Sequence, residues 1–169
     1  MVDSNHDNII NNINKLIDAT DLSDVSIANM LNLSIRKFKY LKRGKVKLKL
    51  IDIELFTNFF NVSINDLSKI NFKTNSQTRE RLKEKYKSNV EYAIHFEQTP
   101  TITYSVKYVL INSPLFHKPM EVNEIKSLFK SRGWIYRSSS ISQALARQTE
   151  LVKIQNHPTK KNIFLYSKK

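Results

Sequence analysis

The chain reads SIRKFKYLKRG over residues 34–44, and this segment contains the start, the inner face and the end of one short helix. Ser34 is suited to accept a hydrogen bond from a backbone N–H group at a helix start. Phe38 and Leu41 lie three residues apart and therefore share one face of a helix. Gly44 tolerates the positive φ at which many helices end. The segment predicts a helix over 35–43 with an apolar inner face. Its outer face would carry Arg36, Lys37, Lys39 and Tyr40.

Apolar residues on either side of this segment predict further short helices. Ile9, Ile13 and Leu16 follow the helical period, and Ser23 is placed to cap the helix that comes next. A second serine cap, Ser63, follows the aromatic run that ends at Phe60. The expected helices cover about residues 5–19, 24–31 and 35–43, a fourth marked by Ile53, Phe56, Phe59 and Phe60, and a fifth that ends near Ile70.

Basic residues concentrate in two parts of this chain of 169 residues, whose net charge is +13. Residues 35–51 contain eight basic residues and no acid, and residues 126–169 contain ten basic residues and the single acid Glu150. Clusters of this kind attract polyanions. Nucleic acid is therefore favoured over a merely solubilising role. A basic membrane-surface helix is less favoured, because Gly44 interrupts the first cluster.

Composition argues against several other classes of protein. Cysteine is absent, and the four histidines lie far apart, so no metal site is expected. With two glycines and no nucleophile beside a base, neither an enzyme nor a cofactor is expected. No apolar run approaches the ~20 residues of a membrane span. The start Met1-Val2-Asp3-Ser4 lacks a signal-peptide pattern, so we expect no membrane association and a cytoplasmic location.

The order and spacing of several motifs resemble the lambda-repressor-like (XRE) helix-turn-helix family over about residues 5–70. The motifs are Leu22-Ser23, Ile27-Ala28, Leu31-Asn32-Leu33-Ser34, Phe38, Leu41, Arg43-Gly44-Lys45 and Val62-Ser63-Ile64-Asn65-Asp66-Leu67. The resemblance implies a mainly α chain whose residues 1–72 form a five-helix domain that binds double-stranded DNA through a recognition helix at 34–43. It also implies a homodimer on a two-fold DNA site.

The resemblance implies DNA contacts on and just after the recognition helix. Base edges would be contacted by Ile35, Arg36 and Tyr40, with Arg36 reading guanine and Ile35 a thymine methyl group. Phosphate groups would be contacted by Ser34, Lys37, Lys39, Arg43, Lys45 and Lys47. The last three could instead form a solvated basic loop. Two positions depart from the family pattern: Asp24 stands where many members carry a phosphate-binding Gln, and Lys49 where a capping Ser is usual.

Residues 73–100 form a charged connector that we expect to be helical from about Gln77 to Phe96. A stripe of apolar residues runs along it, formed by Leu82, Tyr86, Val90, Ala93 and Ile94. The stripe could serve dimerisation, or the helix could be a strut packed on a neighbouring domain. Residues before Pro100 are pushed out of the helical region, which predicts a domain boundary there.

Residues 101–169 are expected to form an α+β domain with a β-hairpin. We expect helices at about 104–111, from Val122 to Gly133 and after Ser138, and strands at about 151–154 and 163–166. This order of elements resembles a winged-helix-like domain. The resemblance implies a second set of DNA contacts by Arg137, Ser139, Gln143, Arg147, Lys160 and Lys161. The alternative is a winged-helix fold used for protein contacts or dimerisation.

Three functions are compatible with these patterns. The first is a sequence-specific transcriptional regulator, which we expect to be a repressor. The second is an accessory protein of replication or recombination, and the third is an architectural or adaptor protein with little sequence preference. The ratio of specific to random DNA binding separates the first two from the third.

Overall fold

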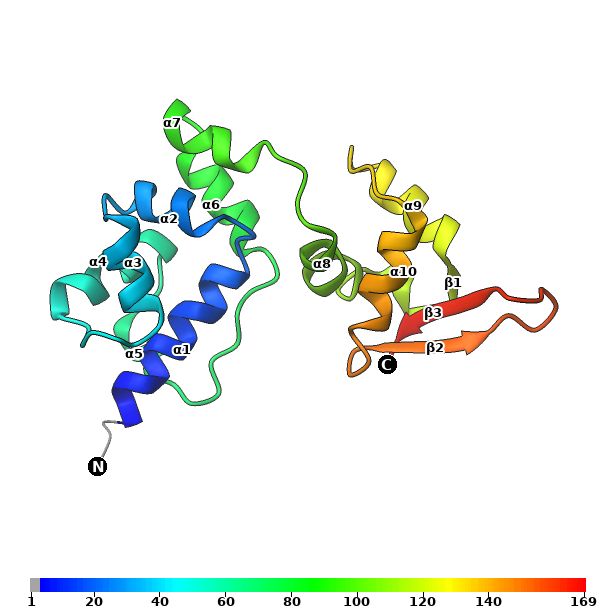
Figure 1. The fold of residues 1–169 in the computed structure, drawn as a ribbon, viewed down its shortest axis with the longest axis horizontal. Coiled ribbons are helices and arrows are strands. Elements are labelled where there is room, and N and C mark those ends of the chain that lie inside the picture. Colours follow the sequence, from blue (N-terminus) through cyan, green and yellow to red (C-terminus); the bar gives the residue numbers. More distant parts are fainter. Residues whose placement is uncertain (1–3) are drawn as a thin grey trace. The chain divides into compact units, whose positions relative to one another are not determined.

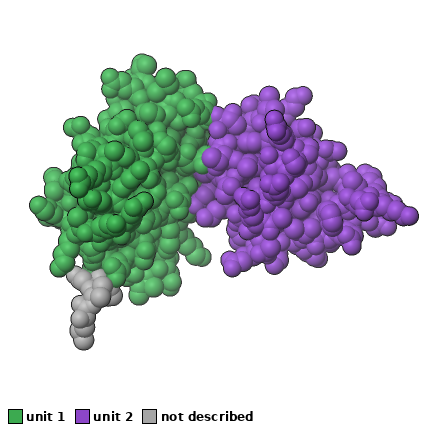
Figure 2. Space-filling view, in the orientation of Figure 1, with its two compact units in different colours: residues 1–98 green, residues 99–169 purple. Residues whose placement is uncertain are grey.

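The computed structural model describes residues 4–169 and is mainly helical, with one small three-stranded antiparallel sheet, which confirms the expected mainly α class. Residues 1–3, which belong to the N-terminal stretch without a signal-peptide pattern, lie outside the described residues. The chain divides into two compact units, residues 1–98 (unit 1) and residues 99–169 (unit 2), coloured separately in Figure 2. Among residues 4–169, no helix is both long enough and apolar enough to cross a membrane.

Unit 1 contains helices at all five of the positions expected in residues 5–70 (Figure 1). They are α1 (Ser4–Asp18), α2 (Asp24–Met30), α3 (Ile35–Lys42), α4 (Leu50–Phe60) and α5 (Ile64–Leu67). Ser23, Ser34 and Ser63 cap α2, α3 and α5, each accepting a hydrogen bond from the backbone three residues on, at 3.0, 3.2 and 3.0 Å. These starts are set locally, by serines that satisfy otherwise unpaired N–H groups.

One apolar core holds the helices of unit 1 together. Phe38 of α3 and Phe56 of α4 are fully buried, with ring centroids 6.4 Å apart. Side chains of all five helices surround them, including Ile13, Leu16, Ile17, Ile27, Ala28, Leu41, Phe59 and Leu67. Burial of this set supplies the main favourable contribution to folding.

The prediction of one helix over residues 77–96 is wrong, because the chain turns after Tyr86. Helix α6 covers Thr78–Tyr86 and helix α7 covers Val90–Ala93, followed by the 3-10 turn η1 (Ile94–Phe96). The break has a local cause: the Asn89 side chain accepts the Tyr92 N–H at 3.4 Å and caps α7, in competition with a continuous helix.

The segment after residue 72 is part of unit 1, which extends to Gln98. Leu82 and Phe96 are buried in the unit 1 core, and Tyr86 packs against it. Of the two alternatives for this segment, α6 therefore fits the strut that packs on a neighbouring domain. In contrast, Val90 and Ile94 of the same apolar stripe are open to solvent, with exposed fractions of 81% and 59%.

Unit 2 contains helices and a small sheet in the order helix, strand, helix, helix, strand, strand. Its elements are α8 (Ile102–Tyr104), the π-helical continuation η2 (Ser105–Leu110), the 3-10 turn η3 (Pro114–His117), β1 (Met120–Glu121), α9 (Val122–Lys130), α10 (Ser138–Ala146), β2 (Val152–Asn156) and β3 (Phe164–Lys168). Strand β3 lies between β1 and β2, and Tyr166 pairs with both Met120 and Ile154. The short strand β1 was not expected from the sequence.

A separate apolar core lies beneath the sheet and helices of unit 2. Phe116, Ile125, Phe129, Ile141 and Leu145 are fully buried in it. The Tyr136 ring meets the Phe129 ring edge-on at 5.3 Å, and Trp134 packs partly buried against the same core. Helix α10 is therefore held on one face, and its other face is open to solvent.

Candidate nucleic-acid interface

Helix α3 is fixed from beneath and at both ends. Phe38 and Leu41 are buried in the unit 1 core, and Ser34 Oγ accepts the Lys37 N–H at its start. At its end, Gly44 has φ +63° and Lys45 N–H donates to the Tyr40 carbonyl at 2.9 Å. The hydroxyl of Ser34 is thus used as a cap, and any phosphate contact that it makes would be additional.

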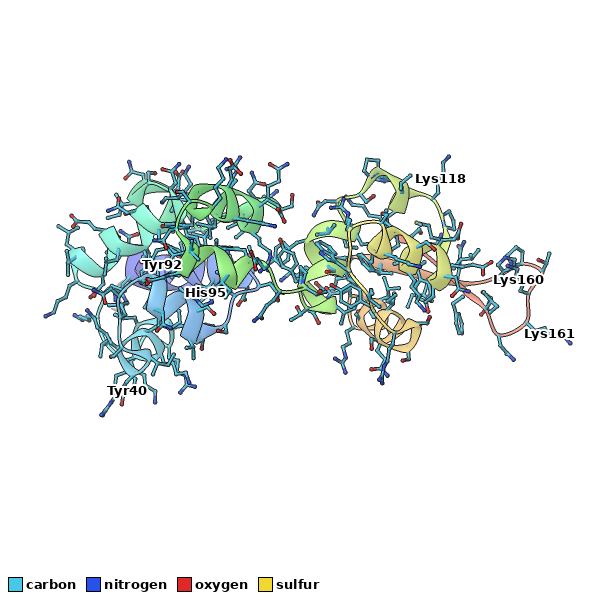
Figure 3. All side chains as sticks on the ribbon, turned by 90° about the horizontal axis from the view of Figure 1, so that it is seen from above. Tyr40, Tyr92, His95, Lys118, Lys160 and Lys161 are labelled. Carbon is cyan, nitrogen blue, oxygen red and sulfur yellow. The ribbon has the colours of Figure 1, made fainter. Side chains whose placement is uncertain are left out.

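The residues expected to contact bases share the open face of α3. Ile35 is 37% exposed and Arg36 is exposed. Arg36 Nε donates to Tyr40 Oη at 3.2 Å, and the guanidinium lies 5.5 Å from the centre of the Tyr40 ring. Tyr40 lies at the outer edge of unit 1 in Figure 3. The tyrosine therefore restricts the orientation of the arginine before any ligand is present.

A groove of about 370 Å³ runs beside α3 and joins the helix to the loop that follows it. Its lining includes Arg36, Lys37 and Tyr40 of α3 and Val46 and Lys47 of the loop. Within residues 4–169, no ion pair is formed by the basic residues Lys39, Arg43, Lys45 and Lys47, all of which are exposed. Their charge is available to an anionic ligand that lies along α3.

Lys37 differs from the other predicted phosphate ligands, because its ammonium is bound to Asp52 within unit 1. The Lys37 Nζ to Asp52 Oδ1 distance is 2.8 Å, and the Asp52 side chain is only 3% exposed. Asp52 Oδ2 also accepts the Lys49 N–H at 3.1 Å and so caps α4, where Lys49 supplies no capping oxygen. An acid three residues after the N-cap residue, here Lys49, is a capping signal that is present in the sequence.

The position of Asp24 also explains a departure noted in the sequence. Asp24 Oδ1 lies 2.8 Å from Lys42 Nζ, so the first residue of α2 is tied to the last residue of α3. Both side chains are about one-third exposed or less, and the pair cancels one positive charge at the end of α3. A carboxylate at this place stabilises the helix pair and does not suit contact with a phosphate group.

The carboxyl of Asp52 should make unit 1 less stable as the pH falls into the acid range. Burial opposes ionisation of its carboxyl, but hydrogen bonds from Lys37 and from the Lys49 N–H, with the charges of both lysines, bring the pKa below the ordinary 3.8. The folded state then binds fewer protons than the unfolded state near that pH. The contribution is complete above the unfolded pKa and is lost as pH falls through the folded pKa.

An Asp52→Asn variant should therefore be less stable than the wild type at about pH 6, and the difference should shrink toward about pH 2. Urea unfolding at the two pH values measures this difference. Glu54→Gln, at an exposed position of the same helix, is the matched control and should produce a smaller change. A difference between wild type and Asp52→Asn that does not vary with pH would contradict the role of the Asp52 charge.

Unit 2 presents the predicted polar residues of α10 on one open side. Ile141, Ala144 and Leu145 are buried against the unit 2 core. The residues predicted to approach DNA are all exposed, at the start of α10, along it and at its end: Arg137, Ser139, Gln143 and Arg147.

The loop between β2 and β3, residues 157–163, carries the two lysines predicted at the tip of a wing (Figure 3). Lys160 Nζ is bound to the Glu121 carboxylate, and His157 Nε2 lies 3.5 Å from Glu121 Oε1. The hydrogen bond from Lys160 lowers the pKa of Glu121. Lys161 forms no ion pair among the described residues. The two lysines are therefore not equivalent, since only the charge of Lys161 is unbalanced.

No local pattern indicates that Glu121 and His157 lie close together, because their contact depends on the pairing of β1 with β3. His157 Nδ1 accepts the backbone N–H groups of Thr159 and Lys160 at 3.2 and 3.1 Å, which folds the loop back on itself. The remaining ring nitrogen faces Glu121. The loop is therefore held by one histidine and one acid on the neighbouring strand.

Within the described residues, no three His, Asp or Glu side chains gather into a group that could hold a metal ion. No family model, no curated protein and no solved structure matches this chain. The residues described above are therefore the basis for any inference about function.

Proposed function

We propose that this chain is a sequence-specific double-stranded DNA-binding protein that regulates transcription, with α3 as its recognition helix. The observation that carries the proposal is the geometry of α3. Its inner face is locked by Phe38 and Leu41, and its outer face presents Ile35, Arg36 and Tyr40 beside unpaired cations. A rigid short helix with this surface is suited to enter a major groove and reach base edges.

Charge divides the proposed contacts into two kinds. Arg36 can donate two hydrogen bonds to one guanine, and Ile35 can contact a thymine methyl group, so these two with Tyr40 read sequence. The unpaired cations Lys39, Arg43, Lys45 and Lys47 bind phosphate groups and set the register of the helix on DNA. Lys37 reaches a phosphate only by leaving Asp52, and so contributes less to affinity.

Unit 2 is proposed as a second DNA-binding module. Its order of elements, with α9 and α10 between β1 and the β2–β3 hairpin, supports a winged-helix assignment. In that assignment α10 approaches the major groove through Arg137, Ser139, Gln143 and Arg147, and Lys161 approaches the minor groove. Lys160 is shielded by Glu121.

The helix arrangement of unit 1 supports assignment to the lambda-repressor-like class, with five short helices and a serine-capped third helix. Proteins that read two-fold DNA sites bind as dimers, and we extend the proposal to a homodimer. The exposed Val90 and Ile94 of α7 and η1 are apolar side chains that a second copy could cover.

Selection of bound fragments from random DNA tests this proposal with the full chain. A regulator of this kind should enrich a defined sequence, and competition with random duplex should give a specificity ratio of about 10³ or more. A ratio near one would contradict sequence-specific regulation and indicate an architectural DNA-binding protein instead. Loss of all duplex binding at low salt would reject the proposal altogether.

Removing Arg36 and removing Lys45 should have different consequences for binding to the selected sequence. Arg36→Ala should cost about 1 to 3 kcal/mol and relax the preference at one base pair. Lys45→Ala should weaken binding to all sequences alike and lower the slope of log affinity against log salt by about one unit. Binding titrations at several salt concentrations, on the selected site and its single-base variants, measure both effects. Equal, sequence-independent losses from the two variants would contradict base reading by Arg36.

A further inference from the structure

Unit 1 contains a large cavity that the proposed DNA contacts do not use. It has a volume of about 870 Å³ and is lined by the end of α4, by residues of the segment between α5 and α6, and by α6 itself. Figure 1 shows that segment running as a long loop before α6 begins. Small-molecule sites in proteins typically measure roughly 300 to 1,000 Å³, so the cavity is large enough for one.

The floor of the cavity is apolar. Six hydrophobic side chains line it, from α1, the end of α4 and the chain around α5 and α6: Leu16, Phe59, Phe60, Val62, Phe72 and Leu82. The Phe59 and Phe60 rings meet edge-on with their centroids 4.9 Å apart, which fixes one wall. Val62 and Phe72 are the partly exposed members of this set, and a hydrocarbon chain that covers them would displace water with a gain in proportion to the apolar area buried.

The rim of the cavity carries four cations, of which only Lys69 is paired with an acid among the described residues. Lys69 is 2.5 Å from Asp66, the carboxylate on the rim, and Lys85 donates to the carbonyls of Asn58 and Phe59. Lys73 and Arg81 also line the cavity, and within residues 4–169 neither forms an ion pair. These two side chains are available to an anionic group, and a guanidinium can hold a carboxylate through two parallel hydrogen bonds.

We infer that this cavity is a binding site for a small amphiphilic carboxylate. The apolar body of the ligand lies against Val62 and Phe72, the partly exposed apolar side chains of the lining, and its carboxylate is held at the rim by Lys73 and Arg81. The site contains no residue of α3, so the inference does not depend on the proposed DNA contacts. A bound ligand contacts both α4 and α6 and therefore stabilises unit 1 against unfolding.

Calorimetric titration of the full chain with octanoate tests the ligand class. One molecule should bind per chain, and affinity should rise about two- to fourfold for each methylene from hexanoate to decanoate. Octanol, which has the same chain without the charge, should bind at least about tenfold more weakly, since hydrogen bonds to a charged group are lost. Equal affinity for octanol and octanoate, or no dependence on chain length, would overturn the inference.

Substitutions at the rim test the position of the carboxylate. Arg81→Gln and Lys73→Gln together should weaken octanoate binding about tenfold or more and leave octanol binding unchanged. Lys83→Gln removes the same charge from an exposed position of the same helix that does not line the cavity, and should have little effect. Equal losses from Lys83→Gln and Arg81→Gln would overturn the inference.

A competition with DNA separates this inference from the proposed function. Octanoate affinity should be the same with and without a saturating short duplex. Displacement of octanoate by duplex, with a dependence on Arg81, would show that the rim cations belong to a DNA-binding surface and would overturn the inference. Failure of the chain to bind any duplex would reject the proposed function and leave the octanoate titration as an independent result.

Discussion

Replacing Phe38 with alanine should destabilise unit 1 by about 3 to 5 kcal/mol, the range for truncating a fully buried phenylalanine. Phe38 has no exposed surface, packs against Phe56, and is the main side chain that joins α3 to the unit 1 core. The loss combines the transfer of the ring to solvent with the cavity that it leaves behind. Chemical unfolding with hydrogen exchange resolved by residue measures the effect, which should appear as faster exchange of unit 1 amides.

Phe129→Ala is the matched control for Phe38→Ala, because Phe129 is equally buried in the core of unit 2. It should accelerate exchange in unit 2 by a comparable amount and leave the amides of α3 protected. The two cores share no residue, so each substitution acts on its own unit. A Phe38→Ala variant that loses less than about 1 kcal/mol would contradict the described role of this ring in fixing α3.

Arg79→Ala should destabilise unit 1 by about 3 kcal/mol, because buried carbonyl groups would lose their hydrogen-bond donor. The Arg79 side chain is 3% exposed, and its Nη1 donates to the Thr20 carbonyl at 2.6 Å. Its Nη2 donates to the carbonyls of Phe96 and Gln98 at 3.4 and 3.3 Å, and the guanidinium lies over the Phe96 ring. One side chain thus joins the end of α1 to the last residues of unit 1.

The effect of Arg79→Ala should be strongest at the end of unit 1, and hydrogen exchange of residues 90–98 measures it directly. Arg79→Lys should restore only part of the stability, because an ammonium cannot reproduce the planar set of donors. Arg81→Ala, on an exposed position of the same helix, is the control and should change stability by less than about 0.5 kcal/mol in the absence of ligand. Equal losses of stability from Arg79→Ala and Arg81→Ala would contradict the role of the Arg79 hydrogen bonds in joining the end of α1 to the last residues of unit 1.

Helix positions in unit 1 were predictable because their signals are local. Ser23, Ser34 and Ser63 each satisfy N–H groups within the next turn, and this requires nothing from distant parts of the chain. Phe38 and Leu41 identify the inner face of α3 by their spacing alone. The break at Asn89 is also local, and the apolar stripe through Tyr86 and Val90 obscured it.

The charge state of the candidate interface was not predictable, because it depends on residues far apart in the sequence. Lys37 has the same chemistry as Lys39, yet Asp52 of α4 binds only Lys37. Lys160 has the same chemistry as Lys161, yet Glu121 of β1 binds only Lys160. Counting basic residues treats all four as equivalent, whereas an ion pair within the protein reduces what a lysine gains by binding phosphate.

The sequence by itself determined where the helices start, which of their faces are apolar, and that positive charge gathers near α3 and near the C-terminal end. These properties depend on neighbours within a few residues and on composition. Tertiary structure alone determined which cations remain unbalanced, that Arg79 is buried, and that a cavity with an apolar floor lies between α4 and α6. Each of these three properties depends on contacts between elements that are far apart in the sequence. Patterns within a few residues do not specify such contacts.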